Sequence, residues 1–119
     1  MGTATIFHNP RCSKSRNSLA ILNEQGLEPE IRLYLEDPPS AEELTSILAM
    51  LDISARDLLR KGESDYKALN LADLDISETE IIKAMTEYPK LNERPIVIKN
   101  GKAAIGRPPE TILDLLKLQ

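Results

Sequence analysis

Hydrophobic and polar positions in the first third of the chain change from a strand pattern to a helix pattern and back. Residues 4–7 form a short β-prone run, and residues 15–25 carry a helical pattern that stops at Gly26, a common helix-ending residue. Residues 31–35 alternate and predict a second strand. A strand, a helix and a strand within about thirty residues predict a βαβ unit whose two strands are parallel.

The middle third of the chain shows helical patterns only. Two Ser-x-x-Glu capping boxes, at residues 40–43 and 77–80, predict the starts of two amphipathic helices. Between these helices we expect a short helix from residue 54 that ends near residues 60–62, and a helical turn over residues 65–70. The middle third is therefore expected to be a helical insert between two β regions.

The last third predicts a β-hairpin followed by a helix. Residues 95–99 and 102–105 flank Asn100-Gly101, the strongest short-range signal for a hairpin turn. The order β-α-β, helical insert, β-β-α resembles the thioredoxin-like fold, an α/β fold with a mixed sheet flanked by helices. In such folds a cis-proline opens the third strand, so the resemblance predicts a cis bond between Arg94 and Pro95. We expect a single domain over residues 1–119.

Composition and charge exclude several kinds of protein. The net charge is −4 and aromatic residues make up only 3 % of the chain, which disfavours nucleic-acid binding. No run approaches the ~18 apolar residues of a membrane span, and no signal-peptide pattern opens the chain. With one cysteine there is no internal disulfide, and a cytoplasmic location is expected. Any anion site has to be built locally from arginines.

The single cysteine, Cys12, lies between the first predicted strand and the first predicted helix. The first N–H groups of a helix lack helical partners, and the positive end of its dipole stabilises an anion there. Arg11, Lys14 and Arg16 lie within four residues of Cys12, and His8 precedes it by four. Cationic neighbours of this kind favour the thiolate, which is the nucleophilic form.

A buried structural cysteine is the alternative to a reactive one, and it would have apolar neighbours. The three residues on either side of Cys12 are Asn, Pro, Arg, Ser, Lys and Ser, so we interpret Cys12 as a functional thiol. His8 is open to two interpretations: it tunes the thiol, or it ends the strand with a hydrogen bond.

Three further arginines lie at the ends of predicted elements. Arg60 closes a short helix, Arg94 precedes the third strand and Arg107 follows the fourth. Each alone is compatible with a solvated surface charge. Loops around a thioredoxin-like sheet converge on the cysteine, so the three together are candidates for binding an anion.

Six short segments, in order along nearly the whole chain, form a combined motif. They are His8-Asn9-Pro10-Arg11-Cys12, Ser15-Arg16-Asn17, Leu33-Tyr34-Leu35, Leu58-Leu59-Arg60, Arg94-Pro95-Ile96-Val97 and Arg107-Pro108. Together they resemble the glutaredoxin-coupled arsenate reductases. The resemblance implies that Cys12 attacks arsenate, that Arg60, Arg94 and Arg107 bind the oxyanion and its reduced adduct, and that His8 helps to form the thiolate.

The resemblance also implies the rest of the reaction. Ser15, Arg16 and the free backbone donors of residues 12–16 would hold further oxygens of the substrate. Because the chain has no second cysteine, the resolving thiol has to come from outside, and glutathione followed by glutaredoxin fits this need. Arsenite would be the product. We expect no bound cofactor, and no metal site, since one histidine and one cysteine cannot form a three- or four-ligand cage.

Three other functions remain as alternatives. Thioredoxin-like regulators that bind RNA polymerase carry a Cys-x-x-Cys switch, whereas Ser15 takes the second position here, and they lack the element that matches Gly106-Arg107-Pro108. A monothiol glutathione-dependent oxidoreductase is compatible with Cys12 but leaves the extra arginines unexplained. A cysteine phosphatase would need Cys-x5-Arg, and Ser18 occupies that arginine's place. The reductase accounts for more of the chain than any of these.

Overall fold

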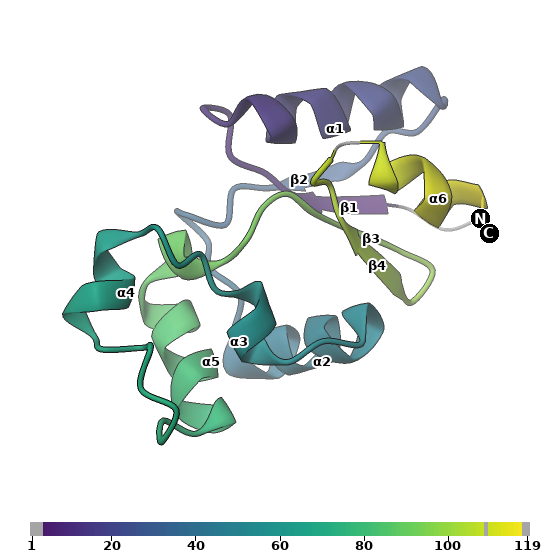
Figure 1. The fold of residues 1–119 in the computed structure, drawn as a ribbon. Coiled ribbons are helices and arrows are strands. Elements are labelled where there is room, and N and C mark those ends of the chain that lie inside the picture. Colours follow the sequence, from purple (N-terminus) through teal and green to yellow (C-terminus); the bar gives the residue numbers. More distant parts are fainter. Residues whose placement is uncertain (1–3, 109, 118–119) are drawn as a thin grey trace. The chain divides into compact units, whose positions relative to one another are not determined.

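In the computed structural model, which describes residues 4–108 and 110–117, the chain divides into two units (Figure 1). The first unit combines Met1–Asp37 with Arg94–Gln119, and the second is Pro38–Glu93. The second unit corresponds to the predicted helical insert, and it contains helices and no named strand among its described residues. The single domain over residues 1–119 stays a prediction.

The first unit is built on a four-stranded mixed sheet. Its strands are β1 (Ala4–Phe7), β2 (Glu30–Arg32), β3 (Ile96–Lys99) and β4 (Lys102–Ile105), in the spatial order β2-β1-β3-β4. Strand β1 is parallel to β2 and antiparallel to β3, and β3 is antiparallel to β4. The predicted βαβ unit and the predicted hairpin are therefore both confirmed.

Two local backbone features of β3 and β4 match the prediction. Asn100 and Gly101 join the strands with φ angles of 52° and 76°, the left-handed values that a tight hairpin turn requires at both central positions. The peptide bond between Arg94 and Pro95 is cis, as expected. The bond between Arg107 and Pro108 is also cis, which we did not predict.

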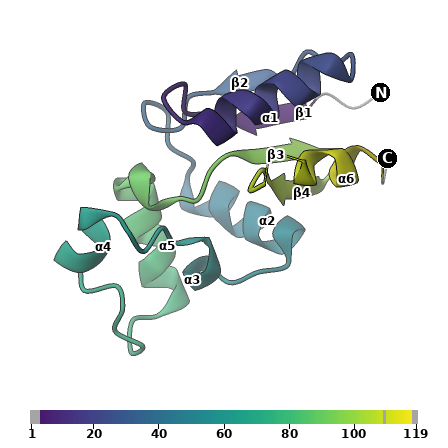
Figure 2. The same ribbon diagram turned by 45° about the horizontal axis from the view of Figure 1, so that its top comes forward.

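Two helices cover one face of the sheet, α1 (Ser13–Glu24) and α6 (Thr111–Lys117), as Figure 2 shows. They pack on the strands through an aliphatic core made of Ile6, Leu22, Val97, Ile112 and Leu115. Helix α1 begins two residues before the predicted start, so that Cys12 is its N-cap residue. The predicted stop is confirmed, since Gly26 follows the helix with a φ of 81°.

The second strand is shorter than predicted. Residues 31–35 alternate in polarity, but β2 ends at Arg32. The carbonyl of Leu33 accepts hydrogen bonds from the N–H groups of Glu36 and Asp37, both at 2.9 Å, so the chain turns there. The Arg32 side chain reinforces the turn by donating from Nε to the carbonyl of Asp37 at 3.0 Å. Backbone bonds at Leu33 and a side chain that bonds five residues ahead thus hold the turn that follows β2.

The second unit consists of short helices around α5. Its elements are α2 (Ala41–Leu51), α3 (Ala55–Leu58), α4 (Ser64–Ala68), α5 (Glu78–Glu87) and the 3₁₀ turn η1 (Pro89–Leu91). Helices α2 and α3 both contact α5, and the apolar stripe of α5 is buried. Arg56 donates to the backbone carbonyls of Leu71, Asp73 and Ile76, so this arginine fixes the loop before α5.

The two predicted capping boxes differ in the structure. Ser40 and Glu43 form a complete box, in which each side chain bonds the backbone N–H of the other residue. The Ser77 hydroxyl oxygen accepts a hydrogen bond from the N–H of Glu80. The Glu80 carboxylate, however, accepts from the Ser77 hydroxyl and not from the Ser77 backbone N–H. The second box is therefore half formed. Ser54 and Asp57 form a complete box that the sequence analysis missed.

Gly106, which follows β4, lies against Ser18 of α1. A Cβ at this position would overlap Ser18 Oγ and lie 2.8 Å from Pro95 Cγ. The Ser18 hydroxyl is fully buried and makes no hydrogen bond to the described residues. The contact among Ser18, Pro95 and Gly106 therefore leaves no room for a side chain larger than hydrogen.

We predict that Gly106→Ala lowers the free energy of unfolding by about 1–3 kcal/mol, the usual effect of overpacking a core. Denaturant unfolding measures this change. Gly62→Ala is the matched control, because a Cβ there has no atom within 4 Å, and a change within about 0.5 kcal/mol is expected. Adding Ser18→Ala to Gly106→Ala should recover part of the loss. A Gly106→Ala protein as stable as the wild type would contradict this account.

Candidate active site

Cys12 is held at the end of the loop that joins β1 to α1. Its N–H donates to the carbonyl of Asn9 at 2.9 Å, and its carbonyl accepts from the N–H of Arg16 at 3.0 Å. The thiol is free and half-buried, and the residue caps the helix without a hydrogen bond from its own side chain. The first N–H groups of α1 are thus left for another acceptor. The predicted placement of the thiol at a helix start is confirmed.

Ser15, in the first turn of α1, joins this loop to the helix. Its Oγ lies 2.6 Å from Nδ1 of His8 and accepts a hydrogen bond from the N–H of Asn9 at 3.0 Å. Ser15 is fully buried, and His8 is only 6 % exposed. The first two residues of the loop, His8 and Asn9, are therefore fixed to the helix that carries Cys12 at its N-cap.

The position of His8 favours its neutral form. Burial lowers the pKa of His8 below its usual 6.5, and the nearby positive charge of Arg16 lowers it further. Because Ser15 Oγ already accepts from Asn9, its hydroxyl hydrogen is available to donate to the unprotonated Nδ1 of His8. His8 thus ends the strand with a hydrogen bond, which was one of its two predicted roles.

The cationic residues around Cys12 have different surroundings. Arg16 is exposed, and its Nη1 donates to the carbonyl of Pro10 at 2.8 Å, so its guanidinium braces the loop. The Asn9 side chain accepts from the N–H of Arg11 at 3.0 Å and shapes the turn before Cys12. The Asn9-Pro10 pair predicted a break after the first strand, as an Asn-Pro turn signal does, but the bond from the Asn9 side chain to Arg11 was not predicted.

Strand register brings Arg94 and Arg107 to the same end of the sheet as the Cys12 loop. Phe7 pairs with Ile96, and Ile96 pairs with Ile105, so the end of β1, the start of β3 and the end of β4 share one edge. Arg94 is half-buried, and its Nε has no hydrogen-bond partner among the described residues. Arg107 is exposed and follows β4 by two residues.

Arg60 belongs to the second unit, where it follows α3. Its guanidinium contacts two carboxylates, those of Glu63 and Glu93. Sequence reasoning missed both partners. The spacing of three residues between Arg60 and Glu63 could have indicated one of them, whereas Glu93 is distant in sequence and carries no such signal. That Arg60 joins the anion site stays a prediction.

A mixed sheet, a cis-proline opening β3 and a thiol at the N-cap of the first helix define a thioredoxin-like protein with an accessible cysteine. Comparison with known proteins agrees with this class. Residues 7–115 match the ArsC family, and the chain belongs to that family.

Several relatives are similar over more than nine-tenths of their length. An uncharacterized protein of Escherichia coli strain K12, YfgD, is 56 % identical over 112 residues, 93 % of this chain and 94 % of that protein. An arsenate reductase of Haemophilus influenzae is 51 % identical over 112 residues, 93 % of this chain and 97 % of the relative. The solved structure of an arsenate reductase from Vibrio cholerae superimposes with a TM-score of 0.92 at 48 % identity, covering 94 % of this chain and 96 % of the other.

The lowered pKa of His8 predicts a pH dependence of stability. The folded state binds fewer protons than the unfolded chain near pH 6.5, so the free energy of unfolding should fall as the pH drops from about 7.5 to about 5. His8 is the only histidine, which isolates its contribution in this range. His8→Asn, whose side-chain oxygen can still accept from Ser15, should show a smaller decrease. Equal pH dependence in the two proteins would contradict the assignment.

Proposed function

We propose that this protein is an arsenate reductase that uses Cys12 as its single nucleophile and external thiols as reductants. The observation that carries the proposal is Cys12, half-buried at the N-cap of α1, in a chain of the ArsC family. Relatives named arsenate reductase match more than nine-tenths of the chain, which supports the same substrate. The free N–H groups of the first turn offer donors to an oxyanion beside the sulfur.

Arginines supply the remaining recognition in this proposal. Arsenate is a tetrahedral oxyanion, and a guanidinium binds such groups through two parallel hydrogen bonds. Arg94 and Arg107 lie at the same end of the sheet as the Cys12 loop. The Nε of Arg94 has no hydrogen-bond partner among the described residues, so it is a buried donor that an oxyanion would satisfy. Arg60 is the third proposed ligand, with Ser15 and Arg16 shaping the loop around the sulfur.

The reaction proceeds by condensation and then reduction. The Cys12 thiolate attacks arsenic, an oxygen leaves as water after taking up protons, and a sulfur–arsenic(V) bond forms. Reduction to arsenic(III) takes two electrons. Two external thiols, one of glutathione and one of glutaredoxin, supply them and end as a mixed disulfide. Water then cleaves the remaining sulfur–arsenic bond, releasing arsenite and returning the Cys12 thiol.

Glutathione is a co-substrate in this scheme, and the proposal includes no bound cofactor or metal. The need for an external thiol follows from the single cysteine of the chain. None of the helices in the described part of the chain has the length and apolar character of a membrane span. We place the reaction in the cytoplasm, where glutathione keeps thiols reduced.

Cys12→Ser is predicted to abolish arsenate reduction while leaving the fold intact, because a hydroxyl at this position is a far weaker nucleophile than a thiolate. A coupled assay with arsenate, glutathione, glutaredoxin and NADPH measures turnover by NADPH oxidation. Cys12→Ser/Ser46→Cys, which moves the thiol to an exposed position on α2, is the matched control and should be equally inactive. Turnover near that of the wild type in Cys12→Ser would exclude this route.

Arg94→Ala and Arg107→Ala should each lower kcat/KM for arsenate by the equivalent of about 1.5–3 kcal/mol, the range of hydrogen bonds to charged groups. Lys102→Ala removes the same charge from the opposite end of β4 and should change kcat/KM little. If both arginine variants behaved like Lys102→Ala, these residues would have no part in the site.

A further inference from the structure

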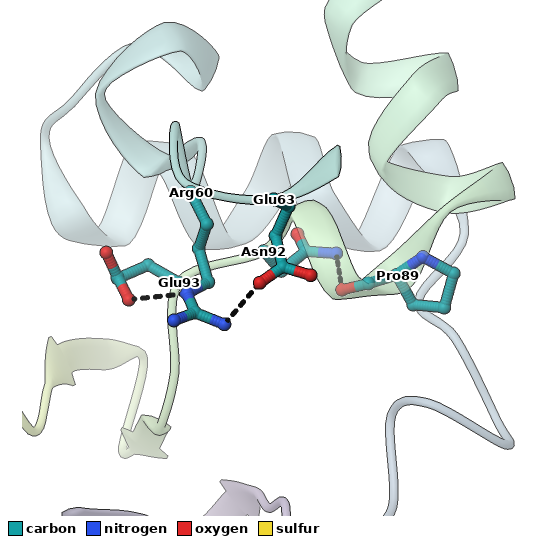
Figure 3. Close-up of polar contacts among 5 residues, drawn as sticks. All are labelled: Arg60, Glu63, Pro89, Asn92 and Glu93. Atoms are coloured by element: carbon teal, nitrogen blue, oxygen red, sulfur yellow. Dashed lines mark hydrogen bonds and ion pairs between the residues drawn. The ribbon is translucent and has the colours of Figure 1, made fainter. Parts of the chain in front are cut away.

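The guanidinium of Arg60 lies between two carboxylates, as Figure 3 shows. Its Nη1 donates to Oε2 of Glu63 at 3.1 Å, and its Nε is 3.4 Å from Oε1 of Glu93. No contact of the third nitrogen, Nη2, is seen among the described residues. One positive charge and two negative charges give these three side chains a net charge of −1. The arginine that is expected to attract an oxyanion is therefore already in contact with two carboxylates.

The backbone holds Arg60 and Glu93 in this arrangement. Leu59 and Asn92 form an antiparallel bridge. On either side of it, the N–H of Arg60 donates to the carbonyl of Leu91 at 2.8 Å, and the N–H of Glu93 donates to the carbonyl of Leu58 at 2.9 Å. Asn92 is only 3 % exposed and donates from Nδ2 to the carbonyls of Met85 and Pro89. Because these bonds fix both chain segments, the approach of Glu93 to Arg60 is built into the unit.

Burial distinguishes this cluster from ordinary surface ion pairs. The side chains of Arg60, Glu63 and Glu93 are 22 %, 25 % and 26 % exposed. The pair between Lys83 and Glu87 on α5, by comparison, is 78 % and 52 % exposed and separated by 3.9 Å. Solvent screens charges less as their exposure falls, so the two carboxylates act on Arg60, and on any anion near it, more strongly than exposed ones would.

We propose that Glu63 and Glu93 compete with the oxyanion for Arg60 and thereby limit the affinity of the protein for arsenate. The inference rests on the proposed function, in which Arg60 is one of the oxyanion ligands. An incoming oxyanion has to displace the hydrogen bond from Glu63 or bind beside two negative charges. The carboxylates thus lower the affinity for the oxyanion by acting through Arg60.

An orienting role for the same carboxylates predicts the opposite result. If Glu63 and Glu93 only held Arg60 ready for the oxyanion, their removal would free the side chain and weaken binding. If they compete, their neutralisation strengthens binding. The sign of the change in affinity therefore separates the two mechanisms.

The test is protection of Cys12 from alkylation by iodoacetamide at increasing concentrations of inorganic arsenate, which reports binding without turnover. In Glu63→Gln/Glu93→Gln the concentration for half-protection should fall about threefold to tenfold, the effect of removing two ion-pair partners. In the Arg60→Ala background the same pair of substitutions should change the arsenate concentration for half-protection less than twofold. In the coupled assay KM should fall and kcat stay the same.

Glu24→Gln/Glu28→Gln is the matched control, since it removes two exposed charges at and beyond the C-terminal end of α1 and should leave half-protection unchanged. Glu63→Gln alone tests the inference if replacement of Glu93 disturbs the fold. Unchanged or weaker protection in the glutamine variants, or tightening that persists with Arg60→Ala, would overturn the competition. If arsenate failed to protect wild-type Cys12 at any concentration, the proposed function would fall, and this inference with it.

Discussion

The first unit depends on one side chain, Ser15, for the geometry of its thiol loop. Its Oγ contacts Nδ1 of His8 and accepts from the N–H of Asn9, so the end of β1 is tied to the first turn of α1. Cys12 lies between these two anchored points, and its own backbone bonds Asn9 and Arg16. Holding the sulfur in place therefore costs little additional conformational entropy, because the residues on both sides of Cys12 are already ordered.

Close packing of α1 on the sheet adds a second constraint. Ser18 meets Gly106 and Pro95 directly, with no room for a Cβ at residue 106. One helix therefore contacts the residue that follows β1 through Ser15, and the start of β3 and the end of β4 through Ser18, three residues later on the same face. The two small polar residues set the height of the helix above the strands, and with it the position of the thiol relative to Arg94 and Arg107.

Local signals in the sequence predicted most of the elements, and long-range contacts account for what they missed. The hairpin at Asn100-Gly101 and the capping box at residues 40–43 depend on neighbouring residues and were confirmed. The second strand was predicted too long because the chain turns at Leu33, whose carbonyl accepts from Glu36 and Asp37, and the Arg32 side chain reinforces this turn. The thiol at a helix start was predictable from the strand and helix patterns that flank Cys12, but the pairing of Arg60 with Glu93 joins segments 33 residues apart and has no local signature.

The arginines of this acidic chain differ in how completely their charge is compensated. Arg16 donates one hydrogen bond to a backbone carbonyl, and among the described residues Arg94 has a buried Nε donor without a hydrogen-bond partner. Arg60 is opposed by two carboxylates. Since a net charge of −4 repels anions at long range, affinity for an oxyanion has to come from uncompensated guanidinium groups at short range. In the proposed site Arg94 would therefore supply attraction, whereas the contribution of Arg60 would depend on how readily its two carboxylates are displaced.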